Sequence, residues 1–347
     1  MFGKSTIRFQ QWIVLSASAL VLLLALVFLG TVFGKFRETA QQGAVDRFEL
    51  ITQGIADNLQ LSLEAHARRA RAFAAADGGA LLAHDRQATV SALDVLQTSV
   101  RQNPGVYGEY IGLSNGDFLQ AIAVRREPTI VQALEAPAAT ELALRVIQAD
   151  ASGQRQERWR FLDAAGTELA ARAAPAAYTP LDRPWYRGAL QGAGAFLTAP
   201  YVFASTQREG LTLSAALPGG QGAYGIDISL HSLPGVLASY RTSDNAFLGV
   251  LDEDGRLLAA HGKGSSALQP PANLLLSLAA AGSPKASAVA ALLGDLPTDH
   301  AQFLDLAGEP HLLVLRRLSV AGSGRYQVVS WAPVSDYTAP VERARRD

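Results

Sequence analysis

The sequence contains no cysteine among its 347 residues. This excludes a disulfide framework, thiolate zinc sites, iron–sulfur clusters and a cysteine nucleophile. An excess of charge of either sign is also missing, because 30 Lys and Arg residues face 31 Asp and Glu residues. A basic stripe for nucleic acid is not visible, so we expect no nucleic-acid partner.

The common sequence motifs of enzymes are missing as well. There is no His-Glu-x-x-His zinc motif and no phosphate-binding Gly-x-x-x-x-Gly-Lys loop. The six histidines are scattered without the spacing of metal ligands. We therefore expect no catalytic residues, no metal, no cofactor and no enzymatic activity in this portion of the protein.

The strongest local signal is an uncharged apolar run over residues 12–33. As a helix it would rise about 33 Å, enough to span the roughly 30 Å core of a bilayer. Trp12 and Phe33 stand where interfacial aromatic residues belong. A cleaved signal peptide is the alternative, but the apolar run is longer than such a core and no small-residue cleavage site follows it. We expect a tail over residues 1–11 on the inner side, a transmembrane helix over 12–33 and the lipid bilayer as a partner.

Helical periodicity continues beyond the apolar run. Apolar residues recur at three- and four-residue steps, and residues 1–100 contain no proline: Phe48, Ile51, Ile55, Leu59 and Leu63. We expect a stalk helix over residues 34–75 and a second helix over about 85–102, ended by Asn103-Pro104-Gly105. Long stalks commonly pair, which favours a homodimer; a single helix packed on its own domain remains the alternative.

Strand patterns follow the helices, and they occur twice. Asn115-Gly116 lies between apolar runs, which predicts a hairpin with a type I′ turn, and Asp254-Gly255 repeats the layout. Further strands are expected at 158–162, 211–217, 223–230, 301–306, 311–318 and 326–333. The pattern predicts an α+β protein with two tandem modules, each with an antiparallel sheet, over residues 76–233 and 234–336. The linker is expected near residues 231–245, and residues 265–296 are expected to form a loop and a short helix.

One cluster of residue types suggests a binding site. Its members are Tyr178, Arg183, Trp185, Tyr186, Tyr201 and Asp227. An arginine can hold a carboxylate through a bidentate fork, an aspartate can accept from an ammonium group, and aromatic rings can wall the cationic end. These residues could therefore form a cup for a zwitterion. The alternative is structural: Asp182 or Asp227 neutralises Arg183, and Trp185 belongs to the core.

The anchor, the stalk and three short motifs resemble the double Cache (dCache) sensor domains of bacterial transmembrane receptors. The motifs are DRPWY at 182–186, PYV at 200–202 and GIDI at 225–228, and the resemblance covers about residues 34–340. It implies two PAS-like modules with the ligand in the membrane-distal one. In the amino-acid-binding subgroup, Tyr178, Arg183, Trp185 and Tyr201 match positions at the ligand carboxylate. Tyr186 matches another wall position, and Asp227 matches the position that holds the amino group.

The resemblance implies the ligand-sensing region of a bacterial signalling receptor, anchored in the inner membrane with its sensor in the periplasm or outside the cell. The expected ligand is an amino acid or a related small amine or carboxylate. Residues 337–347, with Arg343, Arg345 and Arg346, are expected to approach a second membrane helix and a cytoplasmic output domain that this chain does not include. The rival hypothesis is a membrane-anchored scaffold whose modules bind a partner protein.

Overall fold

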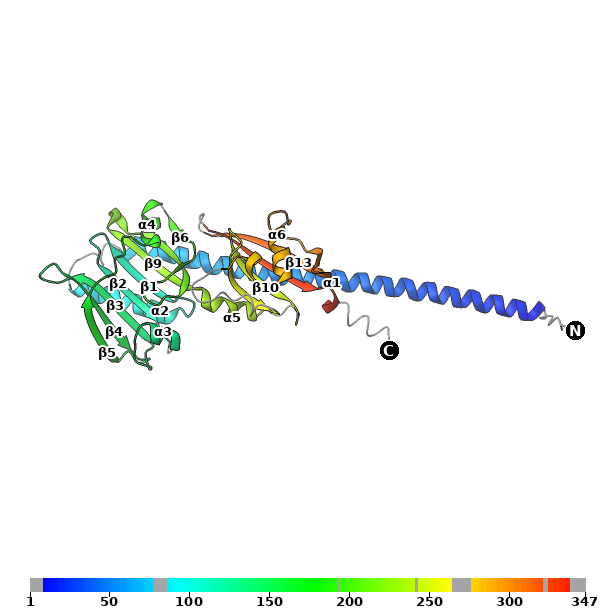
Figure 1. Cartoon of the computed structure of the whole chain (residues 1–347), viewed down its shortest axis with the longest axis horizontal. Helices are drawn as coiled ribbons and strands as arrows, with labels where there is room; N and C mark the ends of the chain where they lie inside the picture. Colours follow the sequence, from blue (N-terminus) through cyan, green and yellow to red (C-terminus); the bar gives the residue numbers. More distant parts are fainter. Residues whose placement is uncertain are drawn as a thin grey trace.

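The computed structural model describes residues 9–77, 86–125, 127–192, 194–240, 243–263, 276–320 and 324–337. The molecule is elongated: helix α1 (Phe9–Asp77) extends along it, and two sheets lie in succession beside its C-terminal half (Figure 1). The N-terminal part of α1 projects beyond both sheets. By length and composition it could cross a membrane, and none of its most apolar window is buried in the protein.

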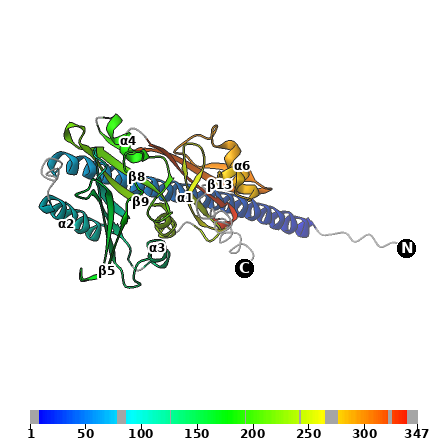
Figure 2. The same cartoon turned by 60° about the vertical axis from the view of Figure 1, so that its left-hand side comes forward.

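Helices α1 and α2 (Arg86–Gln102) agree closely with the predicted stalk and second helix. The stalk was predicted to end at residue 75, and α1 continues to Asp77; residues 78–85 lie outside the described part. From Phe48 onward α1 buries one face against the sheets, with Ile55 fully buried and Leu59 and Leu63 nearly so. Helix α2 packs beside the end of α1 on the same face of the first sheet (Figure 2).

The first sheet is entirely antiparallel and has the strand order β5-β4-β3-β2-β1-β9-β8-β6, with β7 paired to β8. Its strands are β1 (Gly108–Leu113), β2 (Phe118–Ala123), β3 (Leu142–Ala149), β4 (Arg155–Leu162), β5 (Glu168–Pro175), β6 (Ala195–Leu197), β7 (Tyr201–Val202), β8 (Glu209–Ala216) and β9 (Gly222–Ser229). Two short helices accompany it, α3 (Pro128–Ala133) and α4 (Pro184–Gln191), whereas α5 (Leu233–Ala238) follows β9 and contacts the second sheet.

The second sheet has the order β11-β10-β14-β13-β12 and is also antiparallel. Its strands are β10 (Phe247–Asp252), β11 (Leu257–Gly262), β12 (Gln302–Leu306), β13 (Glu309–Val320) and β14 (Gly324–Pro333). Helix α6 (Pro284–Leu292) covers one face and lies in the predicted insertion, of which residues 264–275 fall outside the described part.

The two sheets repeat one topology. The order β2-β1-β9-β8-β6 of the first sheet corresponds strand for strand to β11-β10-β14-β13-β12 of the second. The α+β class with two antiparallel modules is thus confirmed, while the division at residues 233 and 234 stays a prediction. The first sheet adds β3, β4 and β5 beyond the repeat.

The hairpin prediction was right in place and wrong in turn type. Gly116 has φ +88° and Gly255 has φ +71°, but Asn115 is not among the residues with positive φ. Instead the Asn115 side chain accepts a hydrogen bond from the backbone N–H of Asp117 at 2.9 Å, and the Gly116 N–H donates to Leu113 O at 2.9 Å. A type I turn followed by a left-handed glycine therefore closes the loop, because the asparagine side chain already satisfies a backbone donor.

A shared core joins the two sheets to the stalk. One cluster contains Ile55 and Leu59 of α1, Leu213 of β8, Val250 of β10 and Val328 of β14. The sheets therefore do not move independently of α1 without exposing apolar surface, at a cost of roughly 25 cal/mol for each Å². A displacement of strands in the first sheet would therefore be transmitted through this core to the stalk and to the second sheet.

Candidate functional site

Five of the six residues predicted to bind a ligand line one small cavity of about 20 Å³. The cavity, hereafter the distal cavity, lies on the face of the first sheet that points away from α1 and α2. Successive side chains of a β-strand point to opposite faces of the sheet. Along β1, Ile111 therefore packs toward the helices, while Tyr110 points to the opposite face, where the cavity lies. The lining residues are Tyr110, Phe118, Gln120, Arg145, Tyr178, Arg183, Trp185, Tyr201, Phe203, Ala204, Ser205 and Asp227.

The start of α4 positions two of these residues. Pro184 occupies the first turn of the helix, and Arg183 is the extended N-cap residue with φ −81° and ψ 145°. A proline favours this arrangement because it fixes its own φ and disfavours a helical conformation in the preceding residue. A Cβ at Gly112 would come within 2.8 Å of both Trp185 and Pro180. The glycine in β1 therefore allows the start of α4 to dock on the sheet.

Asp227 is the buried acidic group of the cavity. Its Oδ1 accepts hydrogen bonds from Tyr110 at 2.6 Å and from Thr212 at 2.5 Å. The Tyr201 hydroxyl joins the same network at 2.7 Å from Thr212 Oγ1. Burial raises the pKa of Asp227 to about 7, although the two hydrogen bonds and the more distant charge of Arg183 act in the opposite direction. No ion pair among the described residues involves Asp227, so its carboxylate lacks a close positive partner there.

Close packing at a second glycine fixes the position of Tyr110. A Cβ at Gly225 would lie 2.3 Å from the Tyr110 ring. Because Tyr110 and Gly225 are cross-strand partners, the ring lies over the glycine and its hydroxyl reaches Asp227, two residues further along β9. Gly225 thus has a structural role in the GIDI motif: it makes room for the Tyr110 ring, whose hydroxyl group donates a hydrogen bond to Asp227.

Arg183 is the cationic group of the cavity. Its guanidinium lies 5.6 Å from the ring centre of Tyr201 and 6.0 Å from that of Tyr178, within reach of cation–π attraction. It donates a hydrogen bond to Val202 O at 3.3 Å. Within the described ranges no carboxylate comes within 4 Å of it, since Asp182 pairs with Arg187 at 2.6 Å. Neutralisation of Arg183 by Asp182, one structural alternative, is therefore not what the structure shows.

Several lining residues were missed from the sequence. Arg145 of β3 lies 4.5 Å from the ring centre of Tyr178 and pairs with Glu157 at 2.5 Å. Burial raises the pKa of Tyr178 to about 12, and the nearby arginines oppose this rise. Gln120 is 4% exposed, and among the described residues its Oε1 has no hydrogen-bond partner. A buried acceptor without a donor costs stability, so it points to a ligand or a water that donates.

Tyr186 does not line the cavity, which corrects its predicted place in the wall. It is buried, and its ring packs edge-on against Trp185 with the centres 5.5 Å apart. Successive residues of an α-helix point about 100° apart, so Tyr186 points in a different direction from Trp185, which lines the cavity. Trp185 is at once part of the core and part of the lining, since it is 1% exposed and lies 4.6 Å from the Tyr110 ring.

No family model matches the chain. Among curated proteins, Adenylate cyclase 1 of Rhizobium meliloti is 28% identical over 240 residues, which is 69% of this chain and 36% of that protein. Methyl-accepting chemotaxis protein McpG of Pseudomonas putida is 26% identical over 84 residues, 24% of this chain and 14% of that protein. The chain thus spans about a third of the first relative and less of the second.

Solved structures resemble most of the chain. The ligand-binding domain of the Campylobacter jejuni chemoreceptor Tlp3 in complex with 4-methylisoleucine has a TM-score of 0.54 at 15% identity, covering 88% of this chain and 94% of that chain. That of the Pseudomonas fluorescens chemoreceptor CtaA in complex with L-isoleucine has a TM-score of 0.52 at 17% identity, covering 88% and 98%. The chain therefore has the fold of bacterial chemoreceptor ligand-binding domains, in agreement with its resemblance to the double Cache sensors.

Proposed function

We propose that the chain is the extracytoplasmic ligand-sensing region of a bacterial membrane signalling receptor, and that the distal cavity binds an amino acid or a related small amine or carboxylate. The observation that carries the proposal is the arrangement of opposite charges. Arg183 and Asp227, 44 positions apart in the sequence, line one cavity with aromatic walls. The structures of similar fold that bind isoleucine or its analogue add support.

Each charged group has unused capacity for such a ligand. Arg183 can offer a bidentate fork to a carboxylate, because its one hydrogen bond within the described part of the chain goes to a backbone carbonyl. Asp227 can accept from an ammonium group, which would compensate the burial that raises its pKa to about 7. A ligand with both groups would satisfy both residues, and the orphaned Gln120 oxygen could accept a further hydrogen bond.

Binding requires the lining to move. A cavity of about 20 Å³ has room for roughly one water molecule, and an amino acid is several times larger. Phe203, Ala204 and Ser205 belong to the connection between β7 and β8 and line the cavity. We propose that this connection moves outward to admit the ligand. Since β8 shares a core with α1 and the second sheet, such a movement would reach the stalk.

The test is a ligand screen followed by matched arginine variants of the whole chain in nanodiscs. Thermal shifts are measured with amino acids, organic acids and amines; a ligand at 100 times its Kd adds about 2.7 kcal/mol of stability. Arg183→Ala should weaken binding roughly tenfold to a hundredfold, because hydrogen bonds to charged groups contribute about 1.5–3 kcal/mol. Arg187→Ala is the control, since Arg187 is an exposed arginine of the same helix that does not line the cavity.

The same experiment addresses the scaffold hypothesis. If no small molecule stabilises the protein, and Arg183→Ala lowers the melting temperature of the ligand-free protein by many degrees, the aromatic cluster is core and the scaffold is the better explanation. Binding that Arg183→Ala weakens and Arg187→Ala leaves unchanged favours the receptor.

We also propose inner-membrane location, pairing of two copies along the stalk, and a signalling rather than catalytic role for this portion. Leu50 and Leu61 of α1 are 69% and 62% exposed and lie about three helical turns apart on one face. Because the chain has no cysteine, Leu50→Cys would be a single cross-linking site. Cross-linked dimers in membranes support the pairing, and monomers alone would contradict it. A cyclase and a chemotaxis protein both occur among the relatives, so the output class stays open.

A further inference from the structure

A second pocket lies in the second module, and the sequence did not indicate it. This pocket, hereafter the proximal pocket, has a volume of about 360 Å³ and lies among β10, β14, the end of β11 and the start of α6 and β13. Its volume is within the range of small-molecule sites. The residues that line it share no motif with the distal cavity, since Arg-x-Trp-Tyr does not recur in this module.

The floor of the proximal pocket is apolar. Phe247 of β10 and Trp331 of β14 are cross-strand partners, and their rings stack with centres 3.8 Å apart. They are 1% and 4% exposed, so the stacked pair is fixed by packing. Pro333 continues the lining along β14. Such a floor suits the carbon skeleton of a small organic molecule, which would be removed from water on binding.

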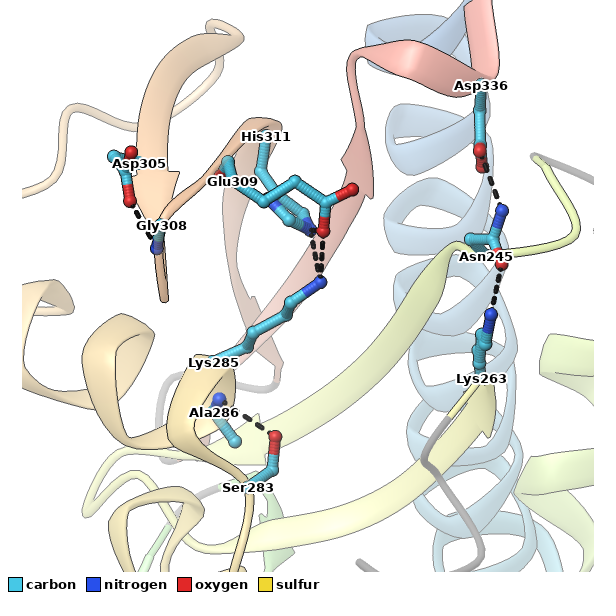
Figure 3. Close-up of polar contacts among 10 residues, drawn as sticks. All are labelled: Asn245, Lys263, Ser283, Lys285, Ala286, Asp305, Gly308, Glu309, His311 and Asp336. Atoms are coloured by element: carbon cyan, nitrogen blue, oxygen red, sulfur yellow. Dashed lines mark hydrogen bonds and ion pairs between the residues drawn. The ribbon is translucent and has the colours of Figure 1, made fainter.

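One side of the pocket carries an oriented lysine. Lys285 Nζ donates to Glu309 Oε2 at 2.7 Å and to His311 Nε2 at 3.0 Å (Figure 3). His311 is fully buried, and its Nδ1 lies 2.7 Å from the Glu309 carbonyl oxygen. Because an ammonium group only donates, the contact with Lys285 uses His311 Nε2 as the acceptor and leaves Nδ1 to donate to the carbonyl. Two partners thus hold Lys285 and leave one of its three donors free.

The other side carries a lysine without a carboxylate partner. Lys263, at the end of β11, donates to Asn245 Oδ1 at 2.7 Å, and Asn245 Nδ2 donates to Asp336 Oδ1 at 2.7 Å (Figure 3). Asn245 therefore links the ammonium group of Lys263 to Asp336. Among the ion pairs of the described residues none involves Lys263. Within the described part of the chain, two of its three donors have no partner.

The balance of hydrogen-bonding groups decides the ligand class. The chain has only four lysines, and two of them line this one pocket. Their unused donors and the uncompensated charge of Lys263 favour an anion, while the stacked Phe247 and Trp331 favour an organic one. We propose that the proximal pocket is a second ligand site, which binds a small organic carboxylate between Lys263 and Lys285 with its carbon skeleton on the aromatic floor. This site is independent of the distal cavity.

The test uses the whole chain in nanodiscs and isothermal titration with acetate, pyruvate, succinate and benzoate. Each carboxylate is compared with its neutral amide, and sodium sulfate at equal ionic strength controls for salt. We expect at least one carboxylate to bind more tightly than its amide. Lys263→Gln and Lys285→Gln should each weaken that binding about tenfold or more, which is about 1.4 kcal/mol. Lys263→Gln is the cleaner variant because Lys285 also supports Glu309 and His311.

Two controls separate this site from general charge and from the distal cavity. Arg317→Gln removes an exposed cation of the same module that does not line the pocket, and it should leave carboxylate binding unchanged. Asp227→Asn should also leave it unchanged, since Asp227 belongs to the distal cavity. The inference is overturned if no carboxylate binds more tightly than its amide, if both lysine variants bind like the wild type, or if Asp227→Asn abolishes the binding.

Discussion

Asp227→Asn should make the ligand-free protein more stable at pH 8 and leave it nearly unchanged at pH 4. Burial raises the pKa of Asp227 to about 7 in the folded protein, against 3.8 for the ordinary carboxyl group. Between these values the folded state holds a proton that the unfolded state has released. The free energy of unfolding therefore falls as pH rises from about 4 to about 7, and it is constant beyond that range.

The expected size follows from the same pKa values. Each unit of pKa corresponds to about 1.4 kcal/mol, so ionising this buried acid costs at most roughly 4 kcal/mol at pH 8. Asparagine cannot ionise, and its amide oxygen can still accept from Tyr110 and Thr212. The variant should thus avoid the cost and keep the hydrogen bonds. In a protein of this length the gain would raise the melting temperature by several degrees.

The assay is thermal unfolding of the ligand-free chain in nanodiscs from pH 4 to pH 8. Asp182→Asn is the matched control, because Asp182 is an exposed acid of the same module that pairs only with Arg187. It should show the wild-type dependence on pH. If Asp227→Asn is instead less stable than the wild type at pH 8, Asp227 is a charged partner that the empty fold needs, and its assignment to an ammonium group fails.

Three further predictions concern the pH dependence of ligand affinity, Gly225 of β9, and the ion pair between Arg69 and Glu109. An ammonium ligand needs ionised Asp227, so its affinity should fall by up to about tenfold for each pH unit below 7. Titration calorimetry would measure this change. Constant affinity down to pH 5 would contradict the role of this acid. Gly225→Ala should displace the Tyr110 ring and abolish ligand binding while circular dichroism keeps its wild-type shape; unchanged affinity would show that the ring's position does not matter. Arg69→Met should lower the free energy of unfolding by about 3–5 kcal/mol, because Glu109 is fully buried 2.5 Å from Arg69 and would lose its positive partner. In denaturant unfolding the double variant with Glu109→Gln should recover part of that loss, and no recovery would show that the two residues are not coupled.

Strands β3 and β5 were not predicted from the sequence, and their residues explain why sequence patterns were not sufficient. Strand β5 has the sequence ELAARAAP, and most of its residues are exposed, so it shows neither β-branched enrichment nor alternation. Its hydrogen bonds to β4 hold it in the sheet. Strand β3 is mostly buried, and its run of apolar residues could equally be a helix segment. In both cases pairing with a neighbouring strand decided the conformation.

The sequence by itself determined what local chemistry controls. The uncharged run over residues 12–33, the helical periodicity of the stalk and the glycine turns at Gly116 and Gly255 each depend on neighbours in the chain, and the structure agrees with them. The motif residues Arg183 and Asp227 were likewise found from their residue types and from the resemblance to a family.

Tertiary structure decided which residues share a site. Gln120 and Arg145 join the distal cavity because β2 and β3 are neighbours in the sheet and alternate side chains point to one face. Tyr186 leaves it because the direction of a helical residue depends on how the helix docks. Lys263 at the end of β11 and Lys285 at the start of α6 both line the proximal pocket, although they are 22 positions apart along the chain. No spacing in the sequence predicts such a meeting, because side chains from different elements come together only when those elements pack.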